Sequence, residues 1–148
     1  MKIRKMSIND YNSVYQLWLN TPGMGLNTAD DSIDGIKKYL IRNPQTCFVA
    51  EKDNEIIGVI LSGHDGRRGY IYHMAVKNSE RKQGIGRKLL DYAMNALKTE
   101  GITKVALVVF EQNENGNAFW ESCGFSTRDD LVYRNKNIIE LENINTGG

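Results

Sequence analysis

The chain has 148 residues, close to the commonest size of a single domain, and we expect one domain over residues 1–148. Hydrophobic residues make up 41% and charged residues 25%, the usual balance of a globular protein. The formal net charge of +1 gives no field that would draw the chain to nucleic acid or to a membrane. No stretch approaches the roughly 20 apolar residues that span a bilayer, and we expect no signal peptide.

The cysteines and histidines argue against a disulfide framework and against a metal. Cys47 and Cys123 lack the paired spacing of a metal or redox motif, which fits a reducing cytoplasm. His64 and His73 are not at metal-ligand spacing from a cysteine or from each other. We therefore predict a cytoplasmic protein with no metal and with neither nucleic acid nor a membrane as partner.

The first half of the chain alternates between strand and helix periodicity. Pro22-Gly23 and Asn43-Pro44 each end a helix, and Asp53-Asn54 is typical of a hairpin turn. The predicted elements are a strand at Lys2–Met6, a helix to about Asn20 with Tyr11, Val14, Tyr15 and Trp18 as its apolar stripe, a helix at Ser32–Arg42 with Ile33, Ile36 and Leu40 as its stripe, and strands at Thr46–Glu51 and Glu55–Ser62.

The second half begins with a polar loop over Gly63–Gly69. Val105–Phe110 is an almost continuous apolar run, which predicts a strand covered on both faces. The other predicted elements are a strand at Tyr70–Val76, a helix over about Gly84–Glu100 with Gly101 as its C-cap, a short helix at about Gly116–Ser122, and a closing hairpin of Leu131–Tyr133 and Ile138–Leu141. The order β-α-α-β-β-β-α-β-α-β-β predicts an α/β or α+β fold, a mixed sheet with helices on its faces.

The stretch Arg81-Lys82-Gln83-Gly84-Ile85-Gly86 carries the most chemical information. Its glycines allow several N–H groups to converge, and the helix that follows adds unpaired first-turn donors, so the stretch suits a pyrophosphate. The Walker pattern fails because no Lys-Ser or Lys-Thr follows Gly86, and the dinucleotide pattern fails because Leu89 replaces its third glycine. The alternative is a plain tight turn with solvated basic residues.

Two separated motifs resemble those of the GNAT N-acetyltransferase superfamily. Arg81-x-x-Gly84-x-Gly86 is similar to the signature of that family, and Ile71–Val76 resembles the strand before it. Asn113–Phe125 resembles the family segment N-x-x-A-x-x-[FL]-Y-x-x-x-G-F. The order of elements matches over about residues 1–141. The resemblance implies a mixed, mostly antiparallel central sheet with helices on both faces and a splayed pair of parallel strands.

The loop His64–Gly69 further resembles that of small bacterial members, of the ribosomal-protein-acetyltransferase-like and YpeA-like kind. The family resemblance implies an acyl-CoA-dependent N-acyltransferase that moves an acetyl group from acetyl-CoA to a primary amine by direct attack, without an acyl-enzyme. It also implies that an N–H near Met74 polarises the acetyl carbonyl. The implied donor-binding residues are Met74, Ala75, Val76, Arg81, Lys82, Gln83, Gly84, Ile85, Gly86, Arg87, Asn113, Gly116, Asn117 and Trp120.

The proton-transfer groups are less clear from the sequence. Trp120 stands where many family members carry the tyrosine that acts as general acid, so Tyr133 becomes a candidate for that role. Tyr72 and Tyr70 match the positions of a strand base, but a tyrosine is a poor base at pH 7. We therefore predict that these hydroxyls order a water relay.

The acceptor side offers only weak candidates. Glu111 and His64 are candidates for binding the acceptor, and each has a solvated alternative. His73 should point away from the acetyl group and be packed and hydrogen-bonded, because it alternates with Tyr72. Asp30 and Asp31 precede a helix and are predicted to cap it.

Several questions stay open at this point. The sequence identifies neither the acceptor, a small molecule or a protein amine, nor the length of the acyl group. The resemblance allows a homodimer, and no residue pattern marks its interface. The alternative function is a non-catalytic acyl-CoA-binding sensor that has lost its acid, as Trp120 suggests.

Overall fold

A computed structural model of the chain describes residues 1–147. Its main sheet has five strands in the order β1-β3-β4-β5-β6, antiparallel except for the parallel pair β5–β6. The strands are β1 (Lys2–Lys5), β2 (Leu26–Asn27), β3 (Phe48–Lys52), β4 (Glu55–His64), β5 (Gly69–Val76), β6 (Val105–Ala106) and β7 (Asn143–Ile144). The helices are α1 (Tyr11–Leu19), α2 (Ile33–Arg42), α3 (Ile85–Thr99) and α4 (Glu114–Ser122), with 3₁₀ turns at Ile8–Asp10 and Asn78–Glu80. The mixed fold class is therefore confirmed.

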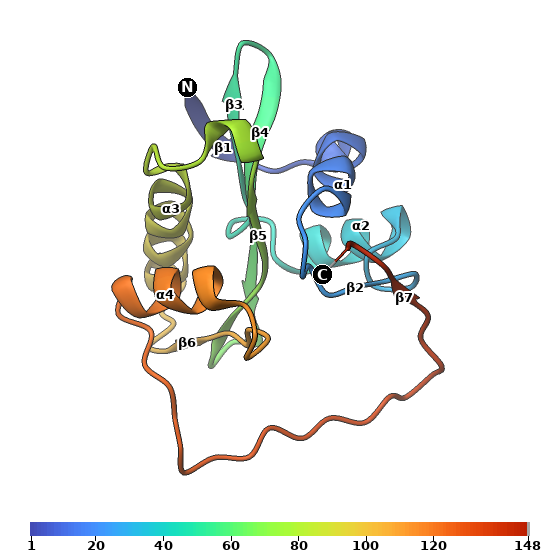
Figure 1. Cartoon of the computed structure of the whole chain (residues 1–148), viewed down its shortest axis with the longest axis vertical. Coiled ribbons are helices and arrows are strands. Elements are labelled where there is room, and N and C mark those ends of the chain that lie inside the picture. The colour runs from blue at the N-terminus through green and yellow to red at the C-terminus, as the bar shows by residue number, and fades with distance from the viewer. Residues whose placement is uncertain (148) are drawn as a thin grey trace.

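Helices cover both faces of this sheet, α1 and α2 on one face and α3 and α4 on the other (Figure 1). Alternation along β3 and β4 supplies the two cores. Val49 and Val59 pack with α1 and α2, whereas Ala50 and Ile60 pack with α3. The apolar stripe of α3 was predicted correctly, since Ile85, Leu89, Ala93 and Leu97 are all buried.

Local signals set most of the boundaries. Asp53 and Asn54 both have positive φ angles, 52° and 63°, as a two-residue hairpin between β3 and β4 requires. Ser32 caps α2 by accepting a hydrogen bond from the Gly35 N–H at 3.0 Å. The predicted stripe of α2 is wrong at Ile33, which is 51% exposed, whereas Ile36 is buried.

Two predictions for the last third of the chain are wrong. The strand predicted at Val105–Phe110 is paired only over Val105–Ala106, and Val108 and Phe110 are more than half exposed. The closing hairpin of Leu131–Tyr133 and Ile138–Leu141 does not form. Instead, β7 pairs with β2, and residues 131–141 contain no strand.

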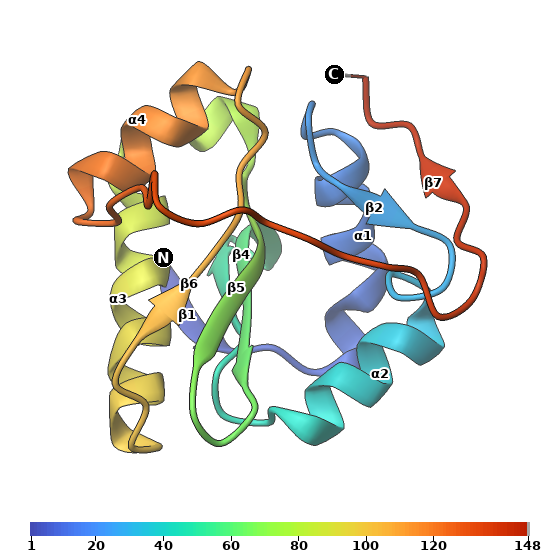
Figure 2. The same ribbon diagram turned by 90° about the horizontal axis from the view of Figure 1, so that it is seen from below.

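Residues 126–142, which we call the strap, run from α4 across to β7 without joining the sheet (Figure 2). The strap pairs with no strand, and its residue Ile138 is fully exposed. Among residues 1–147, none of the helices combines the length and the apolar character needed to cross a membrane.

Candidate functional site

The loop between β5 and α3 has the backbone of an anion-binding turn. Lys82 and Gly84 both adopt left-handed conformations, with φ of 65° and 77°, on either side of Gln83. Alternation of this kind turns successive N–H groups towards one side of the chain. A Cβ built on Gly84 meets nothing within 4 Å, so its surroundings are open. Gly84 is therefore required by its backbone conformation, and the space beside it is free for a ligand.

The donors of this loop have no acceptor within residues 1–147. Within the described residues, none of the six backbone N–H groups from Lys82 to Arg87 donates to a backbone or side-chain oxygen. Three of them open α3, where the helix dipole adds partial positive charge. Ile85 anchors the turn, because its side chain is only 4% exposed. This cluster of free donors can bind one or two phosphate groups.

Basic side chains surround these donors, but two of them are already engaged. Arg81 donates through Nε to the Val76 carbonyl at 3.3 Å, and Arg87 donates to the Ser122 hydroxyl at 3.2 Å. Lys82 is exposed and makes no hydrogen bond in the described part of the chain. Arg81 therefore braces the end of β5, while Lys82 is available to an anion.

The edge of β5 beside this loop is open. The ladder between β5 and β6 ends at the pair Tyr70–Ala106, so from there to Val76 this edge of β5 has no paired strand. The Lys77 N–H donates to the Ile57 carbonyl of β4 at 2.7 Å, and hydrogen-bonding direction alternates along a strand. Met74 and Val76 therefore direct their N–H and C=O groups to the open edge. The groups of Ala75 face β4 instead.

Residues 107–112, which we call the diverging segment, leave β5 after the pair Tyr70–Ala106 and lead into the first turn of α4. Asn113 caps α4 by accepting from the Gly116 N–H at 2.9 Å, and a Cβ at Gly116 would lie 2.6 Å from the Asn113 amide nitrogen. Asn117 donates to the carbonyls of Phe110 and Asn113 at 3.1 and 2.9 Å. Gly116 and Asn117 therefore shape the turn, and the Asn113 Nδ2 has no hydrogen-bond partner within residues 1–147.

Trp120 lies farther along α4 and is partly buried against the core. Its ring makes edge contacts with Phe119 and Phe125 at centroid distances of 5.0 and 5.3 Å. It packs on the apolar cluster beneath α3. Gly86 fits closely there, since a Cβ on it would lie 3.4 Å from Met74 and 3.5 Å from Phe119.

The structure brings the three candidate tyrosines together. Tyr70 and Tyr72 have ring centroids 4.6 Å apart, and Tyr39 of α2 meets Tyr72 edge-on at 5.7 Å. Burial raises the pKa of Tyr70 and of Tyr72, and the neighbouring Tyr133 of the strap raises both further. Nearby Asp30 also raises the pKa of Tyr72. A raised pKa keeps both hydroxyls protonated near neutral pH.

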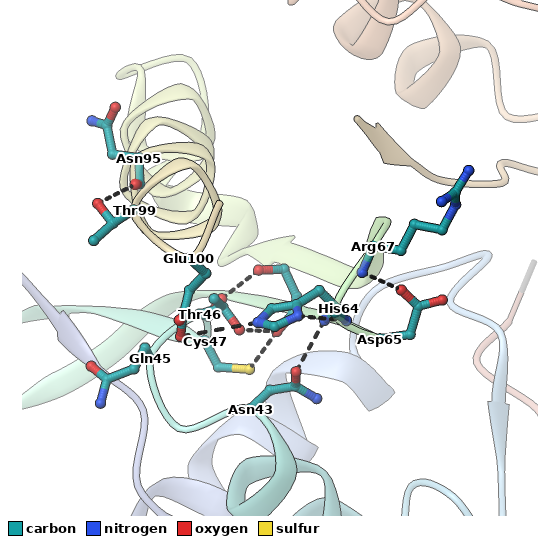
Figure 3. A network of polar contacts seen from close by, with 12 residues as sticks. Asn43, Gln45, Thr46, Cys47, His64, Asp65, Arg67, Asn95, Thr99 and Glu100 are labelled. Atoms are coloured by element: carbon teal, nitrogen blue, oxygen red, sulfur yellow. Dashed lines mark hydrogen bonds and ion pairs between the residues drawn. The ribbon is translucent and has the colours of Figure 1, made fainter. Parts of the chain in front are cut away.

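His64, the last residue of β4, has its own set of contacts. Figure 3 shows His64 among Asn43, Thr46, Cys47 and Glu100. The His64 N–H donates to the Asn43 Oδ1 at 3.0 Å, and its Nδ1 accepts from Gly66 at 2.9 Å. The Nε2 of His64 is 4.0 Å from a carboxylate oxygen of Glu100, at the far end of α3 from the anion-binding loop.

Glu111 is exposed at the end of the diverging segment, and its carboxylate forms no ion pair in the described part of the chain. It is therefore open to a ligand, whereas the ring of His64 is engaged by its own loop.

One buried constellation was missed by the sequence analysis. His73 is packed and hydrogen-bonded as predicted, and its Nε2 lies 2.8 Å from the Asp31 Oδ1. Asp30 and Asp31 do not cap α2, since Ser32 does, so that prediction is wrong. Asp31 is 4% exposed and accepts from the Asn27 N–H at 2.9 Å. The two partners are far apart in sequence, and the inward alternation of His73 was the only available signal.

Two grooves lie on the surface of residues 1–147 near these elements. One, of about 340 Å³, is lined by the chain around β2 and β7 together with Phe110. The larger, of about 820 Å³, lies between α1 and the ends of β4 and β5 and contains no residue of the anion-binding loop. The same residues contain no cluster of three or more histidine, cysteine, aspartate or glutamate side chains able to hold a metal ion.

An anion-binding turn at the start of a helix, beside an open strand edge, suits an extended ligand that bears phosphate groups. The model of the acetyltransferase (GNAT) family matches residues 11–125, and the chain belongs to that family. It is therefore an N-acyltransferase by class.

The relatives agree with this assignment. The chain is 29% identical over 148 residues to an acetyltransferase of Photorhabdus laumondii, covering 96% of this chain and 99% of the relative. The structure is similar to that of the PaiA N-acetyltransferase from Thermoplasma acidophilum in complex with coenzyme A, with a TM-score of 0.74, 20% identity and coverage of 86% and 91%. It is also similar to a ribosomal-protein-alanine N-acetyltransferase from Brucella melitensis, with a TM-score of 0.68, 18% identity and coverage of 92% and 98%. The solved structures support the fold.

Proposed function

We propose that this protein transfers an acetyl group from acetyl-CoA to a primary amine by direct attack on the thioester. The observation that carries the proposal is the set of six free backbone N–H groups from Lys82 to Arg87, next to the open edge of β5. A pyrophosphate suits the first and an extended, amide-bearing arm suits the second. The coenzyme A complex of the Thermoplasma relative supports this choice of donor.

On this proposal the anion-binding loop, the open edge of β5 and the first turn of α4 each have a role in binding the donor. The loop N–H groups hold the pyrophosphate, with Lys82 adding charge. Met74 and Val76 pair with the pantetheine arm as an added strand would. Asn113 offers its free Nδ2 to the arm, and the N–H near Met74 polarises the acetyl carbonyl. Gln83, Gly86, Gly116, Asn117 and Trp120 shape this site through packing and through bonds within the chain.

The reaction then needs no nucleophile from the protein. The amine attacks the carbonyl carbon, the C–S bond breaks, the thiolate takes a proton and the amine loses one. Cys47 is 1% exposed, and burial raises the pKa of its thiol to about 12, so it cannot supply a thiolate at neutral pH. Direct attack within a positioned complex accounts for the rate through proximity.

The tyrosines handle the protons on this proposal. Tyr70 and Tyr72 stay neutral, so they order water that accepts the amine proton rather than accept it themselves. Tyr133, which the strap brings to the same cluster, is the candidate acid for the leaving thiolate. Glu111, whose exposed carboxylate would attract a cationic amine, is the candidate for binding the acceptor, whereas the ring of His64, the other candidate, is engaged by its own loop.

The acceptor class is a primary amine, of a small molecule or of a protein. The relatives whose structures are similar include an aminoglycoside 6'-N-acetyltransferase as well as the ribosomal-protein-alanine enzyme, and both classes belong in a test panel. We place the reaction in the cytoplasm, since both thiols are free. A homodimer is compatible with this function.

The test is a thiol-release assay with acetyl-CoA and a panel of amines: spermidine, lysine, kanamycin and a peptide with an N-terminal alanine. We expect release of coenzyme A with at least one amine. Tyr133→Phe should lower kcat by roughly 10²-fold while binding of acetyl-CoA is retained. Tyr92→Phe, on the exposed side of α3, is the matched control and should leave kcat unchanged.

The water relay has its own test. The double variant Tyr70→Phe, Tyr72→Phe should change the pH–rate profile, and an unchanged profile would exclude the relay. Tight binding of acetyl-CoA without any release of thiol would instead favour the sensor function, which the packing of Trp120 in place of a tyrosine acid suggests.

A further inference from the structure

The His73–Asp31 pair lies in the interior, between β5 and the segment that leads into α2. His73 is 8% and Asp31 4% exposed, and the edge of the Trp18 ring covers the imidazole at a centroid distance of 4.9 Å. Burying such a pair costs desolvation free energy that an apolar pair of similar volume would avoid. The pair therefore calls for an explanation beyond stability.

The hydrogen bonds of the pair indicate how many protons it holds. The His73 Nδ1 lies 2.9 Å from the Tyr72 carbonyl oxygen, which can only accept, so Nδ1 carries a proton. The contact between Nε2 and the Asp31 Oδ1 at 2.8 Å needs a second proton on one of the two atoms. The pair thus holds two protons, is neutral as a unit and satisfies both ring nitrogens.

The side chain and the backbone carbonyl of Asp31 tie this unit to two other elements. The Asp31 Oδ2 accepts from the Asn27 N–H at 2.9 Å, and the Asp31 carbonyl accepts from the Tyr11 hydroxyl at 2.6 Å. Asn27 belongs to β2 and lines the groove of about 340 Å³ that Phe110 borders from the diverging segment. One side of the pair therefore holds a wall of that groove.

The other side of the pair holds an irregularity in β5. Leu61 pairs with His73 and Ser62 with Ile71, so Tyr72 has no partner on β4 and forms a bulge. Its side chain is 57% exposed, beside Tyr70. The bond from His73 to the Tyr72 carbonyl fixes the peptide at this bulge. Bulges commonly re-aim a side chain next to a functional site.

We infer that the His73–Asp31 pair is a positioning device for the acceptor amine, which sets the bulge at Tyr72 and the wall at Asn27 in one fixed relation. This inference rests on the proposed function. The pair touches neither substrate and acts through the two elements that it joins. Its loss therefore changes the use of the amine and leaves the binding of acetyl-CoA intact.

The kinetic test compares two buried carboxylates. Asp31→Ala removes the link, and Asp10→Ala removes a carboxylate that is 8% exposed and paired with Arg4 on the strand at the opposite edge of the sheet. Asp31→Ala should lower kcat/KM for the best amine of the panel by about 10²-fold, as a misplacement of about 1 Å can. Its dissociation constant for acetyl-CoA should stay unchanged. Asp10→Ala should lower the free energy of unfolding and leave kcat/KM unchanged.

A conservative variant provides a rescue. In Asp31→Asn the amide NH₂ can donate to an unprotonated Nε2 while the amide oxygen accepts from the Asn27 N–H, so every bond is kept. Asp31→Asn should therefore retain kcat/KM near the wild-type value. If Asp31→Ala does not fold, His73→Gln serves instead, since it can keep the contact with Asp31 and release the Tyr72 carbonyl.

The nitrogen signals of the rings test the pair without turnover. The chain has only two histidines, and His64→Gln assigns the signals of His73 in protein labelled with ¹⁵N-histidine. Nδ1 of His73 should bear a proton in the wild type, and Nε2 should be unprotonated in Asp31→Asn. An unprotonated Nδ1, equal kinetic losses in Asp10→Ala and Asp31→Ala, or weaker binding of acetyl-CoA in Asp31→Ala would overturn the inference. A wild type that binds acetyl-CoA but turns over no amine would instead refute the proposed function, and the positioning role with it.

Discussion

The backbone conformation alone arranges the donors of the anion-binding loop. Around the groove at β2 and β7, by contrast, side chains from distant segments form the contacts. The loop needs only a left-handed Gly84 and the start of α3 to present its donors. The acceptor side that we propose depends on the contact between His73 of a strand and Asp31 of a turn, and on Tyr133 of the strap near Tyr70. Local sequence therefore determines the first region almost alone, and the second depends on how the whole chain folds.

The largest expected contrast is between the strap and the loop as substrates for trypsin. Both carry exposed basic residues, Arg134 and Lys136 in the strap and Lys82 in the loop. The strap is outside the sheet, so cutting there needs no unfolding, whereas the loop is anchored by Ile85 and braced by Arg81. If opening the loop costs about 4 kcal/mol, the strap is cut roughly 10³-fold faster. Mass spectrometry of early fragments measures this, and first cleavage at Lys82 would contradict it.

A smaller contrast separates the two regions in stability. Leu89 of α3 is fully buried, while Ile138 of the strap is fully exposed. Leu89→Ala should lower the free energy of unfolding by about 2–5 kcal/mol, and Ile138→Ala by less than about 0.5 kcal/mol. Urea denaturation of both variants provides the comparison. A large loss in Ile138→Ala would mean that the strap packs in solution.

The smallest expected effect concerns the buried carboxylate of Asp10, which belongs to neither region, at different pH. Burial raises the pKa of Asp10, but the hydrogen bonds from Arg4 and from the Ser7 N–H outweigh it and hold this pKa below the ordinary value of 3.8. The stabilisation is therefore present above about pH 3.8 and is lost as the pH falls through the lower, folded-state pKa. Asp10→Asn should lower the free energy of unfolding at pH 7 by about 1–3 kcal/mol.

That difference should shrink as acid protonates the wild-type carboxyl. Urea denaturation at pH 7 and in acid measures it. A difference between Asp10→Asn and wild type that does not depend on pH would assign the effect to packing rather than to the charge of Asp10.

The sequence predicted the elements around the anion-binding loop well because their signals are local. Gly84 and Gly86, the start of α3 and the stripe of Leu89 and Ala93 all follow from short spacings, and α3 and β5 lie where expected. The mixed sheet followed from the alternation of strands and helices, and its five strands confirm it.

The strap, the end of the strand predicted at Val105–Phe110 and the contact between His73 and Asp31 were predicted poorly, because their structure depends on residues far away in the sequence. The β-branched residues of the strap have strand propensity, but no neighbour pairs with them, so Ile138 and Ile139 remain exposed. Val108 was expected in a covered strand for the same reason. The link between His73 and Asp31 joins residues 42 positions apart, and no spacing in one sequence announces such a contact.

Titration of acetyl-CoA into three proteins tests the central claim, that the loop from Arg81 to Gly86 binds the donor. Gly84→Glu and Gly101→Glu are matched, since the two glycines lie just outside the two ends of α3 with φ of 77° and 82° and have open space around them. Both variants carry the same strain and the same charge. Gly84→Glu should weaken binding by at least about 100-fold, because its carboxylate repels the pyrophosphate at close range. Gly101→Glu should bind as the wild type does. Equal losses in both variants, or no binding by the wild type, would contradict the account.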